Sequence, residues 1–282
     1  MSIETKYLNL LKATLTDYIH VDDTHANALP LAHTLPKGVL KNLRYKLISR
    51  LARRSHLLVS KMNRSSENEL RLQRENGADW PPFAFTMVGL KRLDSLENQI
   101  RQIVHDDIEG DLLETGSWRG GAAIFMQAML EILNAQDRKL WVCDSFEGLP
   151  PPNPDKYPED LDDIHHKLSV MAVSKETVRS NFERFGLLGD NVQFVKGFFK
   201  DTLPSLDVKK ISLLRLDGDM YESTMDALVP LYGKVSRGGF IVIDDYALPP
   251  CRKAVEDFRE QNNIDDEIIR IDEISVYWRK SS

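Results

Sequence analysis

Four aspartates follow two apolar segments of the chain in a pattern that could bind a metal. Asp217 and Asp219 come directly after one segment, and Asp244 and Asp245 come directly after the next. Several unpaired carboxylates in one cleft would raise one another's pKa and resist ionising together. A hard divalent cation relieves that repulsion, and Mg²⁺ prefers a few carboxylates with water and substrate oxygens. The pattern therefore predicts a Mg²⁺ site, although a single aspartate in such a place can also cap a helix.

A second group of polar residues predicts a cofactor that combines adenosine with an amino acid. Glu114 precedes the glycine turn that begins at Gly116 and Ser117, and its charge would repel a pyrophosphate but accept from an ammonium group. Asp144 ends the next apolar segment, before Ser145, where an acidic side chain can accept both hydroxyls of a ribose. The alternatives are a solvated carboxylate at Glu114 and a turn-capping role for Asp144.

A metal beside such a cofactor points to a substrate hydroxyl. Coordination of the hydroxyl to Mg²⁺ lowers its pKa and orients it toward a methyl donor. Asp217 could then accept the proton as general base. His165 and His166, which follow the prolines at 150–152, lie where a lid or substrate loop is expected, but a surface histidine pair is an equal alternative. Neither Gly-x-Ser-x-Gly nor His-Glu-x-x-His occurs, which disfavours a hydrolase or a zinc enzyme.

The elements that must position these residues alternate between strand and helix. Helical patterns are expected at 90–104, 121–133, 175–185, 225–232 and 252–261. Strands are expected at 111–116, 139–144, 192–197, 211–217 and 240–244, with a closing hairpin at 267–271 and 275–279 and a turn at Gly238 and Gly239. This order predicts an α/β fold with a doubly wound, mostly parallel sheet covered by helices. Ligands of such sheets bind beyond the carboxyl ends of the strands, where the strand order reverses.

The first 80 residues are predicted to form a helical N-terminal extension, a lid or an oligomerisation element, ahead of a catalytic domain at 81–282. The segment 41–54 is basic and carries leucines at helical spacing, a pattern that favours packing on the parent domain or a second subunit over binding to a membrane. The prolines in 76–82 should interrupt any helix there, so this stretch is expected to be a linker or an entrance loop between the two regions.

The composition describes an ordinary soluble protein with a small-molecule substrate. The 282 residues are 42% hydrophobic and 28% charged, and the net charge of −6 argues against nucleic-acid binding. No apolar segment approaches the length of a membrane-spanning helix, so the protein is not expected to be an integral membrane protein. The first twenty residues lack a secretory pattern, which predicts a cytoplasmic location. Cys143 and Cys251 are expected to stay reduced.

Longer motifs resemble those of a known family over roughly the last two-thirds of the chain. The segments that carry the resemblance are Glu114-Thr-Gly-Ser-Trp-Arg-Gly-Gly121, Asp144-Ser-Phe-Glu-Gly-Leu-Pro150, Asn181-Phe-Glu-Arg-Phe-Gly-Leu-Leu188, Gly197-Phe-Phe-Lys-Asp-Thr-Leu-Pro204, Leu216-Asp-Gly-Asp-Met-Tyr-Glu-Ser-Thr224 and Asp244-Asp-Tyr246. Together they resemble the macrocin, mycinamicin and novobiocin sugar O-methyltransferases.

The resemblance implies a class I methyltransferase with a Rossmann-like sheet, S-adenosylmethionine as methyl donor and a sugar or vicinal diol of a natural product as acceptor. We also expect a homo-oligomer, which the N-terminal segment could build. By the same resemblance, Asp217, Asp244 and Asp245 hold Mg²⁺, with Asp217 as base. The cofactor would contact Glu114 at its methionine end and Asp144 at its ribose, together with Gly116, Ser117, Ser145 and Phe198. Two alternatives remain: an NAD-linked oxidoreductase, disfavoured by the missing dinucleotide motif, and a non-catalytic adaptor of the same fold.

Overall fold

The structure is a computed structural model that describes residues 1–21, 29–30, 60–61 and 65–281. The predicted basic helix at 41–54 lies outside the described residues. Two short strands, β1 (Leu29–Pro30) and β2 (Ser60–Lys61), pair with each other in antiparallel orientation. The strands that end at the predicted site residues belong to the described part of the chain.

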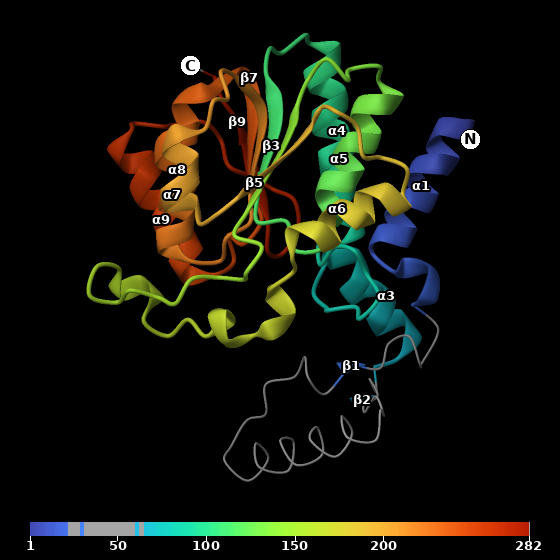
Figure 1. The fold of residues 1–282 in the computed structure, drawn as a ribbon, viewed down its shortest axis with the longest axis horizontal. Helices are drawn as coiled ribbons and strands as arrows, with labels where there is room; N and C mark the ends of the chain where they lie inside the picture. The colour runs from blue at the N-terminus through green and yellow to red at the C-terminus, as the bar shows by residue number, and fades with distance from the viewer. Residues whose placement is uncertain (22–28, 31–59, 62–64, 282) are drawn as a thin grey trace.

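A mixed sheet of seven strands forms the centre of the molecule (Figure 1). Its spatial order is β5-β4-β3-β6-β7-β9-β8. The first five are parallel: β5 (Val192–Lys196), β4 (Leu140–Asp144), β3 (Asp111–Thr115), β6 (Ile211–Leu216) and β7 (Val235–Ile243). The last two strands are antiparallel to their neighbours: β9 (Val276–Arg279) pairs with β7, and β8 (Ile269–Arg270) pairs with β9. This topology confirms the predicted doubly wound α/β fold and its C-terminal hairpin.

Helices cover both faces of the sheet and bury its apolar side chains (Figure 1). One face carries α4 (Leu90–His105), α5 (Gly121–Ile132) and α6 (Lys175–Arg184), and the other carries α7 (Phe199–Thr202), α8 (Tyr221–Leu231) and α9 (Pro249–Gln261). Every residue of β6 is buried, as expected for a parallel strand between two helical layers. The two apolar layers hold the strand ends in fixed positions, so the side chains beyond them share one rigid edge.

The glycine pair at 238–239 does not form the predicted turn. Both glycines lie inside β7, which begins at Val235 rather than at Phe240. Gly238 has a φ of +82°, and the pairing of β7 with β6 shifts register between Ile211 and Leu213. The glycines therefore mark an irregularity within a strand, which a glycine pair can signal as well as a turn.

The described part of the N-terminal region shares the core of the main domain. Leu8, Leu11 and Leu15 of α1 (Ile3–Leu15) are buried in the same cluster as α4 and α5. A second N-terminal helix, α3 (Glu67–Asn76), ends at Gly77 in a left-handed conformation. That end coincides with the break predicted at 76–82, whereas the predicted domain boundary at residue 80 stays a prediction.

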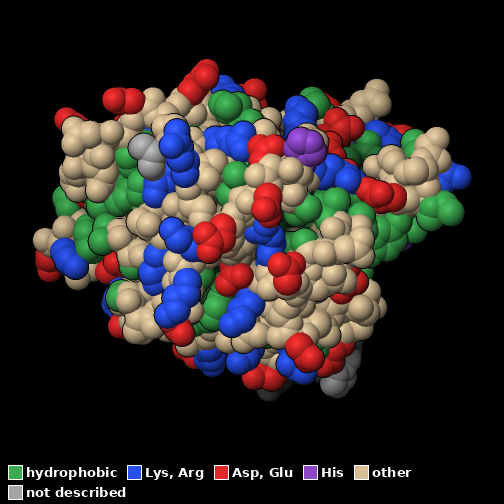
Figure 2. Space-filling model, turned by 90° about the horizontal axis from the view of Figure 1, so that it is seen from above, with side chains coloured by type: hydrophobic (Ala, Val, Ile, Leu, Met, Phe, Trp, Pro, Cys, Tyr) green, Lys and Arg blue, Asp and Glu red, His purple; other side chains and the backbone are tan. Residues whose placement is uncertain are grey.

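The surface carries charges of both signs. Acidic and basic side chains intermingle with apolar ones on the face shown in Figure 2. Among the helices that the structure describes, none has the length and apolar character needed to span a bilayer.

Candidate active site

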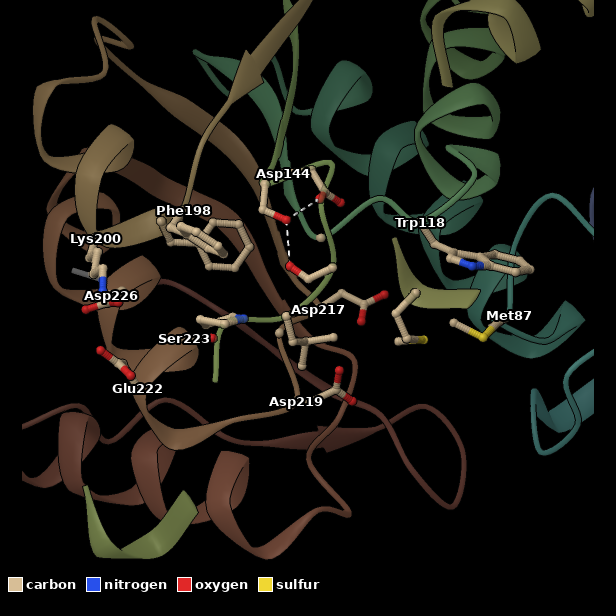
Figure 3. A pocket seen from close by; sticks show the side chains of 18 residues that line it. Met87, Trp118, Asp144, Phe198, Lys200, Asp217, Asp219, Glu222, Ser223 and Asp226 are labelled. Carbon is tan, nitrogen blue, oxygen red and sulfur yellow. Dashed lines mark hydrogen bonds between the residues drawn. The ribbon is translucent and has the colours of Figure 1, made fainter. Parts of the chain in front are cut away.

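A cleft lies at the carboxyl ends of the central strands. It has about 750 Å³ of free space, part of it open to solvent. The strand order reverses here, because β4 lies on one side of β3 and β6 on the other. Figure 3 shows Phe198 and Lys200 at one end of the cleft, Met87 and Trp118 at the other, and Asp217 and Asp219 between them. The lining residues are Met87, Gly116, Trp118, Asp144, Ser145, Gly148, Leu149, Pro150, Met171, Phe198, Phe199, Lys200, Asp217, Gly218, Asp219, Glu222, Ser223 and Asp226.

Gly116 joins β3 to the cleft at a point where no other residue fits. Its φ is +81°, and a Cβ atom added there would lie 1.8 Å from the carbonyl oxygen of Asp217. The close approach arises because Asp217 N donates to Thr115 O at 2.9 Å and so pins the two strand ends together. Glycine is thus needed both for the left-handed backbone and for the space.

Asp144 is held rigidly at the end of β4. Its Oδ2 accepts from Ser117 N at 2.7 Å and from Ser117 Oγ at 3.0 Å. Its Oδ1 accepts from Phe146 N at 2.7 Å. The alternative turn-capping role is therefore present, yet Asp144 also lines the cleft together with Ser145 and Phe198. Ser117 orients Asp144 and is not itself a lining residue.

Asp217, Asp244 and Asp245 converge as the metal prediction requires. Each offers one carboxylate oxygen, and the three oxygens lie within 4.8 Å of one another. Asp219 lies two residues further along the same loop and is not part of this group. Its backbone is left-handed, with a φ of 58°, and its side chain lines the cleft. The geometry thus groups Asp217, and not Asp219, with the two aspartates that directly follow β7. Three hard oxygen ligands at this separation fit a small divalent cation that completes its shell with water and substrate.

Two buried arginines that the sequence reasoning missed neutralise much of this acidic charge. Arg215 Nη1 lies 2.7 Å from Glu114 Oε1, and its Nη2 lies 2.9 Å from Asp217 Oδ2 and 2.7 Å from Asp244 Oδ1. Arg92 of α4 lies 2.6 Å from the other oxygen of Asp244. An arginine inside the apolar run of β6 was the available signal, because a charge buried between two helical layers needs partners.

Glu114 does not line the cleft. It is fully buried beneath the cleft, and its Oε2 has no hydrogen-bond partner among the described residues. Burial raises the pKa of Glu114 to about 8, against the opposing effect of Arg215. Its predicted contact with the cofactor stays a prediction. Arg215 connects it to Asp217 and Asp244 through ion pairs.

The remaining acids of the site are also shifted. Burial, reinforced by Asp217, raises the pKa of Asp219 to about 7. Burial, together with Asp219 and Asp244, raises the pKa of Asp245 to about 8. Burial and the neighbouring acids Asp245 and Asp244 raise the pKa of Asp217 well above its ordinary value. For Asp244, burial acts in the same direction, but Arg215 and Arg92 outweigh it and lower the pKa. Repulsion among several carboxylates was the basis of the metal prediction, and it is present here.

The segment 150–172 crosses one side of the cleft and is tied to the sheet domain at several points. Asp160 is fully buried, and its carboxylate accepts from the first backbone N–H groups of α8, Tyr221 N at 2.7 Å and Glu222 N at 3.0 Å. Trp118 Nε1 donates to Val170 O at 2.8 Å. These contacts place the segment beside the N-terminus of α8, which directly follows the loop that carries Asp217 and Asp219.

The fold and the site define a class I methyltransferase. A family model described as macrocin-O-methyltransferase (TylF) matches residues 4–280, and the chain belongs to this family. The finding confirms the resemblance and extends it to the N-terminal region, which the sequence motifs did not cover. The protein is therefore an O-methyltransferase by family.

Several relatives and one solved structure support this assignment. The chain is 38% identical to mycinamicin III 3''-O-methyltransferase of Micromonospora griseorubida over 279 residues, 98% of this chain and 96% of that protein. It is 46% identical to demethyldecarbamoylnovobiocin O-methyltransferase of Streptomyces niveus over 210 residues, 74% of this chain and 80% of that protein. The structure of the O-methyltransferase NovP matches with a TM-score of 0.81 and 37% identity, covering 99% of this chain and all (100%) of that one.

Proposed function

We propose that this protein is a Mg²⁺-dependent O-methyltransferase that moves a methyl group from S-adenosylmethionine to a hydroxyl of a sugar or vicinal diol on a natural product. The observation that carries the proposal is the convergence of Asp217, Asp244 and Asp245 within 4.8 Å, at the edge of a cleft between the ends of β3, β4 and β6. The family names in the comparisons support the acceptor class, because its relatives act on glycosylated natural products.

The cleft offers a suitable contact for each part of the cofactor. Asp144, fixed by Ser117, would accept from the ribose hydroxyls, and the Phe198 ring at one end of the cleft would contact the adenine. Gly116 lets the backbone approach the amino-acid portion. S-adenosylmethionine itself supplies an electrophilic methyl group, so the protein needs only to bind it, exclude water and orient the acceptor.

The acidic cluster would hold Mg²⁺, which supplies Lewis-acid polarisation of the acceptor hydroxyl. Asp217 would accept the hydroxyl proton, because its pKa is raised and its side chain, about a third exposed (31%), is the most open of the three carboxylates in ion pairs with Arg215. Asp219 is the second candidate for the base. It lines the cleft and its pKa of about 7 suits proton transfer near neutral pH.

The proposal is tested first by cofactor choice. S-adenosylhomocysteine should raise the melting temperature, since a ligand at about one hundred times its dissociation constant stabilises by ~2.7 kcal/mol, and NAD⁺ should not. Differential scanning fluorimetry measures both. Mass spectrometry of products from mycinamicin III and demethyldecarbamoylnovobiocin, the acceptors in the relatives' names, then tests the acceptor class. Stabilisation by NAD⁺ alone would favour the oxidoreductase alternative.

The metal-free protein should lose stability as the pH rises. The folded-state pKa values of Glu114, Asp219 and Asp245, about 8, 7 and 8, exceed those of an unfolded chain. The native state therefore holds protons that the unfolded state has released between about pH 4 and pH 8, and the free energy of unfolding falls across that window. Mg²⁺ should offset this loss by binding the ionised cluster.

Thermal unfolding in millimolar MgCl₂ and in EDTA at matched ionic strength measures the effect. The increase in melting temperature caused by Mg²⁺ should be larger at about pH 8 than at about pH 5.5, and Asp245→Asn should remove most of it. An equal response at both pH values, or none in the wild type, would count against the metal site.

The sequence also predicts a homo-oligomer and a cytoplasmic location, and it leaves a non-catalytic adaptor as an alternative. A homo-oligomer is compatible with the exposed apolar side chains of α1, where Ile3 is 87% and Leu10 is 63% exposed. The non-catalytic adaptor is disfavoured, because the acids at both strand ends are present and converge.

A further inference from the structure

A histidine–aspartate pair stands in the segment that crosses the cleft. His165 Nδ1 lies 2.7 Å from Asp163 Oδ2, and His165 N donates to Asp163 Oδ1 at 2.9 Å. The Asp163 side chain is only 9% exposed, while that of His165 is 30% exposed. In the described part of the chain, no hydrogen bond reaches His165 Nε2. One edge of the ring is thus fixed by the protein, and the other is open to a ligand.

The position of the pair relates it to the reacting end of the cleft. Asp160, three residues before Asp163, is fixed to the start of α8, and α8 follows directly on the loop that carries Asp217 and Asp219. His165 and Asp219 interact electrostatically, and this interaction contributes to a raised pKa of His165 after the hydrogen bond to Asp163. His165 is not itself among the residues that line the cleft, but this interaction places its ring near Asp219, which does line it.

The hydrogen bond to Asp163 decides which chemistry the ring can offer. A carboxylate at Nδ1 requires a proton on Nδ1, so Nε2 carries either a lone pair or, in the imidazolium, an N–H group. A hydroxyl both donates and accepts, and it can bond to Nε2 in either state.

We propose that His165 is a positioning residue whose Nε2 hydrogen-bonds the acceptor hydroxyl next to the one that is methylated, with Asp163 fixing the ring. The inference rests on the proposed function and names how the same site selects a vicinal diol. Such a bond discriminates strongly, because a polar group built to bind a hydroxyl is left unpaired when that hydroxyl is missing.

Two isosteric variants separate a contact through Nε2 from mere support of the loop. The amide of His165→Gln reaches the position of Nε2, whereas that of His165→Asn reaches only the position of Nδ1. With an aryl α-L-rhamnoside as acceptor, we expect His165→Asn and His165→Ala to lower kcat/KM about tenfold or more, mainly through KM, and His165→Gln to retain most of it. Melting temperature and affinity for S-adenosylhomocysteine should not change.

Deoxy analogues of the rhamnoside test the contact directly. For the analogue that lacks the neighbouring hydroxyl, wild-type kcat/KM should fall by a similar factor, and His165→Ala should cause no further loss. His105→Ala is the matched control, because His105 forms a comparable pair with Asp106 at 2.9 Å but lies at the end of α4 and is 87% exposed.

The outcomes are distinct. Equal losses in the Gln and Asn variants, with a lowered melting temperature, would overturn the inference in favour of a structural role. Normal turnover by His165→Ala would overturn this inference and leave the proposed function intact. If the wild type binds S-adenosylhomocysteine but methylates no glycoside, the proposed function fails and this inference fails with it.

Discussion

Replacing Asp217 by Asn is expected to abolish methyl transfer while leaving the affinity for S-adenosylhomocysteine nearly unchanged. Asn keeps the shape of the side chain but removes the charge that would hold Mg²⁺ and the basicity that would accept the hydroxyl proton. Loss of a positioned base alone typically costs about 10²- to 10⁴-fold in rate, and a weakened metal site adds to that. Asp144 and Phe198, the proposed cofactor contacts, lie elsewhere in the cleft (Figure 3), so binding should persist.

Two further variants make this test specific. Asp207→Asn removes an exposed carboxylate, 81% accessible, that pairs with Lys209 far from the cluster, and it should leave the rate unchanged. Asp219→Asn separates the two candidate bases. With Asp217 as the base, Asp219→Asn should leave turnover and the Mg²⁺-induced thermal shift largely unchanged, because Asp219 lies outside the group of three converging oxygens. A large loss of turnover with an intact thermal shift would assign the base to Asp219 instead. Full turnover by Asp217→Asn would refute both roles assigned to Asp217.

Replacing Arg215 by Met is expected to be among the most destabilising single changes at the site. The Arg215 side chain is 2% exposed and pairs with Glu114, Asp217 and Asp244. Removing one partner from a buried ion network leaves uncompensated charge and costs about 3–5 kcal/mol. The loss should be smaller at acidic pH, because Glu114, whose pKa is already about 8, can then take up a proton.

Urea unfolding at about pH 8 and about pH 6 measures this loss. Arg179→Met is the matched control, since Arg179 forms an ion pair with Glu183 that is more than half exposed on both sides, at 56% and 54%. Such a surface pair contributes little, and the control should change the free energy of unfolding by less than about 0.5 kcal/mol. A loss in Arg215→Met no greater than in the control would show that the arginine does not compensate the cluster.

Much of this protein could be predicted from the chain alone because its signals are local. Apolar segments ending in Glu-Thr-Gly, in Asp144 and in paired aspartates indicated a parallel sheet whose polar strand ends meet at one edge. Parallel strands buried on both faces leave little freedom in their direction, so residues that end neighbouring strands must converge. The fold and the grouping of Asp217 with Asp244 follow from that constraint.

What the tertiary structure alone decided concerns contacts between segments distant in sequence. Periodicity does not show that Arg215 would pair with Glu114 on the neighbouring strand. It also does not show that Arg92, on α4, would pair with Asp244. Nor does it show that the carboxylate of Asp163 would hold the ring of His165, because a loop without periodicity has no sequence-encoded direction. Local spacing determines which side chains stand at a strand end, but only packing determines which opposite charge lies beside them.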